Sequence, residues 1–131
     1  MRYMLLCYDD PQAWQQRGDA ALREAMQEAV QLTHEIDAQG QYLTAAPLYP
    51  VDTATSVRVR QGRRMVTDGP FTETREHLGG FYLIDVPNLD EAIRIAERHP
   101  GAQYGTVEIR PVMELAGLPP DRLAGQFNHS S

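Results

Sequence analysis

This sequence contains very little cysteine, no long apolar run and no excess of basic residues. Its single cysteine, Cys7, excludes an internal disulfide framework and is compatible with a reducing compartment. No apolar run approaches the ~20 residues that a membrane-spanning helix requires. The first residues enter a strand-like run at once, without the apolar region and cleavage site of a signal peptide. We therefore expect a soluble, cytoplasmic protein that does not bind a membrane.

The charge balance is acidic, which excludes a second group of functions. The formal net charge is −6 at pH 7, and the isoelectric point is near 5.1. Nucleic acids and anionic membranes are bound by basic surfaces, so neither is an expected partner. The chain has 131 residues, of which 42% are apolar, and this is enough for one domain with its own core.

The usual motifs for a metal, a cofactor or a nucleophilic serine are also absent. The four histidines show no metal-ligand spacing, and no cysteine cluster accompanies them. Gly79-Gly80 leads into a strand and does not open a helix, so it is not a phosphate-binding loop. No Gly-x-Ser-x-Gly motif occurs. We expect neither a metal nor a cofactor.

Hydrophobic periodicity predicts the order strand, helix, strand, hairpin, strand, helix and strand. The predicted strands span residues 2–8, 42–48, 53–60, 63–67, 80–86 and 106–112, and the predicted helices span residues 19–39 and 89–98. Asp19 and Asn88 are the expected helix N-caps, and Gln61-Gly62 is the expected hairpin turn. Two β-α-β units around a hairpin predict an α+β, ferredoxin-like antiparallel sheet with two helices on one face. This domain occupies residues 1–115, and residues 116–131 form a loosely held tail.

Each predicted helix has an apolar stripe that is expected to face the sheet. The two stripes consist of Leu22, Met26, Ala29, Thr33 and Ile36, with Ala25 and Val30 beside them, and of Leu89, Ala92, Ile93, Ile95 and Ala96. The segment between the first strand and the first helix, residues 12–18, is polar except for Ala13 and Trp14. It predicts a connector or a short helical turn.

Strands 2–8 and 80–86 are apolar on both of their alternating faces. A strand that is apolar on both sides is buried on both sides, yet two helices cover one face of the sheet only. We therefore predict a homodimer that packs sheet to sheet, of the dimeric α+β barrel type. Such packing leaves a cleft between the sheet and the loops for a small molecule.

The stretch from residue 65 to residue 83 organises the chain, because a turn at Asp68-Gly69-Pro70-Phe71 joins two strands there. Asp68 at a strand end is a candidate general base or substrate-orienting group. Alternatively, its carboxylate accepts backbone N–H groups of Phe71 or Thr72 and holds the loop. Phe71 is expected in the core or the dimer seam, or as a wall of the cleft.

A charged run, residues 73–77, follows the turn. Its ordinary interpretation is a solvated face with weak ion pairs. The functional alternative pairs Arg75 or His77 with an anionic ligand near Asp68. Tyr82 offers either a pocket-lining hydroxyl or core packing, and Arg110 either a cross-strand ion pair or an anion site in the dimer cleft.

Several of these segments, in this order, resemble the YCII-related family in its DGPF-domain branch. They are residues 1–6, 53–58, 66–76, 78–82, 90–92 and 107–112, within a resemblance that covers residues 1–115. It implies a ferredoxin-like fold, usually dimeric, in a family whose activity is largely unknown. Members of this branch are often encoded beside extracytoplasmic-function sigma factors, which implies a regulatory association.

Relatives in the wider family have been proposed as enzymes with a His–Asp pair, the histidine lying on the first helix about three turns before its closing glycine. Here that region contains Ala29 and Val30, and the nearest histidine is His34. The favoured hypothesis is therefore a dimeric ligand-binding or regulatory module. The alternative is a small cofactor-independent enzyme that uses Asp68, with His77, for acid–base chemistry.

Overall fold

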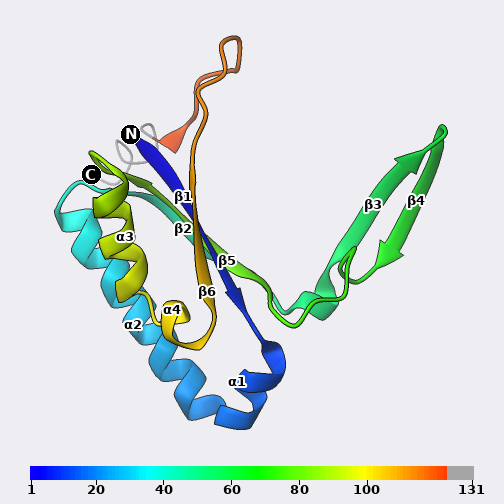
Figure 1. Ribbon diagram of the computed structural model, residues 1–131, viewed down its shortest axis with the longest axis horizontal. Helices are drawn as coiled ribbons and strands as arrows, with labels where there is room; N and C mark the ends of the chain where they lie inside the picture. The colour runs from blue at the N-terminus through cyan, green and yellow to red at the C-terminus, as the bar shows by residue number, and fades with distance from the viewer. Residues whose placement is uncertain (124–131) are drawn as a thin grey trace.

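The computed structural model describes residues 1–123 and shows a four-stranded sheet, two long helices and a projecting hairpin (Figure 1). In chain order the elements are β1 (Arg2–Asp9), α1 (Pro11–Arg17), α2 (Asp19–Ala38), β2 (Tyr42–Pro47), a 3-10 turn η1 (Val51–Thr53), β3 (Thr55–Arg60), β4 (Arg63–Asp68), β5 (His77–Asp85), α3 (Leu89–Arg98), α4 (Gly101–Tyr104) and β6 (Thr106–Pro111).

The main sheet has the strand order β2-β5-β1-β6, and every neighbouring pair is antiparallel. The two helices α2 and α3 lie together on one side of it (Figure 1). This arrangement confirms the predicted α+β, ferredoxin-like fold. Both β1 and β5 are central strands, as their apolar composition predicts.

Alternation along β1 and β5 separates the two faces of the sheet. Tyr3, Leu5 and Ile84 are buried against the helices. On the opposite face, Met4 lies beside Leu83, and Leu6 lies beside Phe81. Because cross-strand neighbours share a face, these four apolar side chains form a continuous patch on the side away from α2 and α3. We call them the open-face patch.

The helix stripes were predicted only in part. Ala25, Leu32 and Ile36 are the buried residues of α2, whereas Met26 and Val30 are more than half exposed. The predicted stripe omitted Leu32, because it was centred about one residue position away from the true core face. In α3, Ala92, Ile95 and Ala96 are buried, but Leu89 and Ile93 are not.

The helix starts follow local chemistry. The Asn88 side chain accepts a hydrogen bond from the Glu91 N–H at 3.0 Å, which confirms the predicted cap of α3. For α2, Gly18 is the N-cap and Asp19 is already the first helical residue, so the predicted cap was one residue late. Residues 11–17 form α1, whose cap is Asp10 through the Gln12 N–H.

The hairpin forms a sheet of its own and does not join the main one. Gln61 and Gly62 have φ values of +51° and +74°, which match the two left-handed positions of a type I′ turn. Val57 lies opposite Val66, as predicted. The strands β3 and β4 project away from the body of the molecule (Figure 1).

The predicted tail begins within the described residues. Asp121 forms an ion pair with Arg2 at 2.7 Å, so the chain returns to the start of β1 at this point. Residues 124–131, the remainder of the predicted tail, lie outside the described residues. Within residues 1–123, no helix is long and apolar enough to cross a membrane.

Substitution of Asp68 tests whether the stability of the turn depends on the Asp68 carboxylate. The side chain is exposed, and among residues 1–123 it makes no hydrogen bond or ion pair. We therefore expect Asp68→Ala to change the free energy of unfolding by less than ~0.5 kcal/mol. Asn88→Ala, which removes a cap that is present, should lower it by about 1 kcal/mol. Urea unfolding of both variants checks this, and a loss for Asp68→Ala as large as that for Asn88→Ala would contradict it.

Candidate functional site

A cavity of about 460 Å³ opens between α2 and the end of the sheet where β1 finishes and β5 begins. Most of its wall is apolar or aromatic. Its lining comprises Cys7, Tyr8, Asp9, Trp14, Leu22, Ala25, Met26, Ala29, Val30, Thr33, Tyr42, Ala45, Ala46, Pro47, Gly79, Gly80, Phe81, Tyr82, His99, Pro100 and Gly101. The size and character of this wall are typical of a small-molecule site.

The cavity explains the exposed part of the α2 stripe. Met26, Ala29, Val30 and Thr33 were predicted to face the sheet, and all four line the cavity instead. An apolar stripe wider than the core needs is therefore the sequence signal for this site. That signal does not distinguish a packed face from one that borders an open cavity.

Asp9 is the charged residue of the lining. Its Oδ2 accepts a hydrogen bond from the Trp14 Nε1–H at 3.1 Å. A Cβ atom at Gly79 would lie 3.3 Å from both carboxylate oxygens, so the glycine leaves the space that the carboxylate occupies. Burial raises the pKa of the Asp9 carboxyl; the Trp14 hydrogen bond opposes this, while the negative charges of Asp10 and Glu76 add to it.

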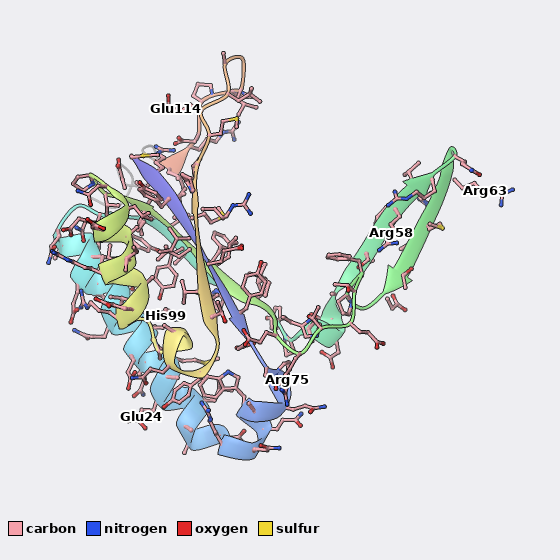
Figure 2. The ribbon with its side chains drawn as sticks, viewed as in Figure 1. Glu24, Arg58, Arg63, Arg75, His99 and Glu114 are labelled. Atoms are coloured by element: carbon pink, nitrogen blue, oxygen red, sulfur yellow. The ribbon has the colours of Figure 1, made fainter. Side chains whose placement is uncertain are left out.

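His77 lies directly opposite Asp9 in the pairing of β1 with β5. Its positive charge, when present, lowers the pKa of Asp9 slightly. Arg75 is exposed, and its Nε lies 3.6 Å from an oxygen of Asp10, near the start of α1 (Figure 2). The structure thus places both basic residues of the predicted charged run beside the acids that end β1.

Two further polar groups of the cavity are Tyr82 and His99. The Tyr82 hydroxyl donates to the Ala29 carbonyl at 3.2 Å, and its ring meets the His99 ring edge-on at 5.2 Å. His99 Nδ1 accepts the Gly101 N–H at 2.9 Å, so the neutral ring carries its proton on Nε2. Burial lowers the pKa of His99, which favours this neutral form.

Cys7 contributes an apolar wall and no nucleophile. Burial, with a smaller effect from Asp9, raises the pKa of the thiol to about 11. The reactive thiolate is therefore scarce at neutral pH. Among residues 1–123, no group of three or more His, Cys, Asp and Glu side chains is placed to hold a metal ion.

The Trp14 indole contacts Tyr104 and Arg17, whose guanidinium lies 5.5 Å from the centre of the indole ring. The indole packs edge-on against the Tyr104 ring at 5.3 Å, and the Arg17 guanidinium lies 3.7 Å from the centre of the same Tyr104 ring. These contacts join α1 to α4 and orient the indole N–H toward Asp9. In the sequence, Trp14 lies in a polar connector that gives no indication of this role.

The residues singled out from the sequence are not brought to one place. Tyr82 lines the cavity, and His77 lies beside Asp9. Asp68 and Phe71 are exposed at the base of the hairpin, and Arg110 is exposed on β6 opposite Met4; none of the three lines the cavity. With 71% of its surface exposed, Phe71 does not plug the core of its own chain.

Neither Asp9 nor His99 is singled out as a site residue by the sequence alone. Asp9 directly follows the predicted strand 2–8, where Asp9-Asp10-Pro11 is an ordinary strand end, and His99 is one of four histidines without metal-ligand spacing. Each becomes a candidate only when the sheet register and the end of α3 place it at the same cavity.

Removing the charge of Asp9 should stabilise the fold at neutral pH. Its raised pKa means that the ionised carboxylate is less favourable in the folded than in the unfolded state. We expect Asp9→Asn to raise the free energy of unfolding at pH 7. The difference should shrink as pH falls through the raised pKa, because the wild-type carboxyl then becomes neutral as well.

Urea unfolding of both proteins at several pH values measures this difference. Asp68→Asn, which neutralises an exposed carboxylate, is the matched control and should show no comparable gain. A lower stability of Asp9→Asn at pH 7 would mean that the ionised carboxylate supports the fold.

Comparison with known proteins places the chain in a family. The model of the YCII-related domain matches residues 1–116. An uncharacterized protein of Rhizobium meliloti (strain 1021) is 36% identical over 117 residues, which cover 86% of this chain and 92% of that protein. The family match covers the cavity, the main sheet and the hairpin, and the chain belongs to the YCII-related family.

Proposed function

We propose that this protein is a dimeric small-molecule-binding module whose ligand occupies the cavity at Asp9. The observation that supports this most directly is a largely apolar cavity with one carboxylate fixed in its wall. Ligand sites commonly combine an apolar wall with a few polar groups that orient the ligand. Asp9, Tyr82 and His99 are among the polar residues of this wall.

The charges of the wall favour a ligand with an apolar body and a basic nitrogen. Asp9 is the lining residue with a formal charge at neutral pH, and His99 is kept neutral by burial. A protonated amine would pair with the carboxylate while the aromatic rings of Tyr8 and Trp14 face it. An anionic ligand would meet the carboxylate in a poorly solvated site, which is unfavourable.

Trp14 provides a direct test, because it is the single tryptophan and lies in the cavity wall. We expect phenethylamine to change its fluorescence saturably, with phenethyl alcohol binding more weakly and phenylpropionate weakest. Asp9→Asn should weaken amine binding by at least ~10-fold, as the loss of a charge-assisted hydrogen bond predicts. Asp68→Asn should bind as wild type does.

The outcomes of this titration distinguish a failure of the proposed binding function from a failure of the assigned ligand class. If none of the three probes changes the fluorescence or releases heat in calorimetry, the proposed binding function is wrong. If phenylpropionate binds as tightly as phenethylamine, the cavity binds a ligand but the assigned ligand class is wrong.

The dimer is supported by the open-face patch. Met4, Leu6, Phe81 and Leu83 form the centre of a sheet face that lies away from both long helices. A second copy of the same face, packed about 10 Å away, would cover them. This is the homodimer that the two-sided apolar strands predict.

Two charge substitutions on the two faces of the sheet test the dimer. Leu5 is 1% exposed on the helix side, so Leu5→Asp should cost more than ~3 kcal/mol and unfold the chain. Leu83→Asp, on the opposite face, should leave a folded monomer. Circular dichroism reports folding and light scattering reports mass. A wild-type monomer, or a Leu83→Asp variant that remains a tight dimer, would contradict the proposed interface.

An enzymatic alternative rests on the pairing of Asp9 with His77. The two residues lie opposite each other on β1 and β5, and the pKa of Asp9 is raised by burial. Acid–base catalysis needs such a group within reach of a bound molecule. The carboxylate in this alternative is Asp9, because Asp68 is absent from the cavity wall. Chemical turnover of a bound amine that Asp9→Asn abolishes would favour it.

The regulatory association implied by the DGPF resemblance is a separate proposal. Its partner would be an extracytoplasmic-function sigma factor. Co-purification of the protein with a sigma factor encoded beside it tests the association, and separate elution of the two proteins at high concentration would exclude it.

A further inference from the structure

The hairpin of β3 and β4 is an exposed, two-stranded arm that projects from the body of the molecule. We define the arm as residues 55–68, which comprise β3, the Gln61-Gly62 turn and β4. All residues of β4 are exposed, and in β3 only Ser56 is partly covered. The arm projects from the end of the main sheet where β2 finishes and β5 begins (Figure 1).

The two faces of the arm differ in chemistry. Val57 lies opposite Val66, with Val59 two residues along on the same face. The other face carries Arg58, Arg60 and Arg63 together with Met65; Arg58 and Arg63 are labelled in Figure 2. Arg64, opposite Val59, lies on the first face. The arm is therefore a ribbon with one face that carries the three valines and Arg64, called the valine face, and another that carries the other three arginines.

The valine face has no cover within the described chain. Val57, Val59 and Val66 are 62%, 59% and 54% exposed. A two-stranded ribbon alone is at best marginally stable in water. Yet its turn has the type I′ geometry that suits the strand twist, so the arm is built as a regular structure. A contact outside the chain that covers the valines would stabilise it.

The formal charge of the arm indicates which kind of surface would bind it. The four arginines and Asp68 give the arm a formal charge of +3, so the rest of the chain, within a total of −6, carries −9. One such surface is a shallow hollow beside α2. It is lined by Glu24, Glu28 and Glu35, and also by Arg98, which pairs with Glu35 and leaves two acidic side chains in excess. The positively charged arm is thus complementary to the negatively charged remainder of another copy of this chain.

The length of the arm is sufficient for such a contact. Six residues per strand at ~3.4 Å each extend about 20 Å. Packed sheets lie about 10 Å apart. An arm that leaves the edge of one sheet is therefore long enough to pass a second sheet and reach the helices behind it.

We propose that the arm of each copy docks on a second copy of this chain, with its valines on apolar surface and its arginines against the acidic body. This inference rests on the dimer proposed above and assigns to that dimer a second contact, distinct from the open-face patch. Arginine is enriched at protein interfaces because its planar group pairs well with carboxylates.

The arm can be deleted without moving the two residues that flank it. The Gly69 N–H donates to the Ala54 carbonyl at 2.6 Å, so the residues that flank the arm are already adjacent. Replacing residues 55–68 by a short Gly-Ser turn should leave the cavity intact, and the Trp14 fluorescence titration with phenethylamine checks this. Sedimentation of both proteins then measures the dimer dissociation constant.

We expect the armless protein to dissociate at least ~30-fold more readily, as removal of a central interface cluster predicts. Val57→Thr/Val66→Thr, which keeps the strand shape, should weaken the dimer in the same direction. Arg60→Gln/Arg63→Gln should reduce the sensitivity of the dimer to salt. An exposed pair that lines neither the hollow nor the cavity, Gln16→Ala/Gln103→Ala, is the matched control and should change nothing.

An armless protein that dimerises as tightly as wild type would overturn the arm contact and leave the open-face dimer standing. A wild-type protein that is monomeric would overturn both. If such a monomer bound a duplex DNA probe and the armless form did not, the occupant would be nucleic acid and the proposal of a second copy would be wrong.

Discussion

The pairing of β1 with β5 is the constraint on which the rest of the structure depends. These two central strands are apolar on both faces, so their pairing creates the helix-side core and the open-face patch together. The same register sets Asp9 opposite His77 and places Gly79 next to the Asp9 carboxylate. A register shift between Cys7 and Tyr8 lies just before these residues. The fold and the candidate site thus arise from one interaction.

The cavity retains groups that a core designed for stability alone would replace. Burial disfavours the charge of Asp9, and one hydrogen bond from Trp14 supports the carboxylate. Gly79 leaves space that a larger side chain would fill, and Met26 remains partly exposed on α2. Unfavourable features of this kind gather at functional sites, where binding is gained at some cost in stability.

The cavity and the arm are connected through the chain. Pro47 at the end of β2 and Gly79 near the start of β5 line the cavity, and the chain between them contains the arm. A molecule bound in the cavity and a partner bound to the arm would therefore both act on the same two strand ends. In the proposed dimer, ligand binding and assembly share this segment.

The sequence by itself determined the types and the order of the elements. Asn88 caps α3 through its own neighbours, Gln61-Gly62 closes a hairpin by its left-handed backbone, and alternation identifies the central strands. These features depend on residues close together in the chain, so they could be predicted without the fold. Their combination was sufficient for the ferredoxin-like topology.

Only the tertiary structure decided where the candidate site lies. From the sequence, Asp68 was the leading candidate because of its conspicuous turn, but the carboxylate in the cavity is Asp9. Met26 and Val30 fit a core stripe, yet both line the cavity and are more than half exposed. Asp9 and His77 are distant in sequence and meet through strand register. That register is set by the packing of the whole sheet, and no local pattern around either residue records it.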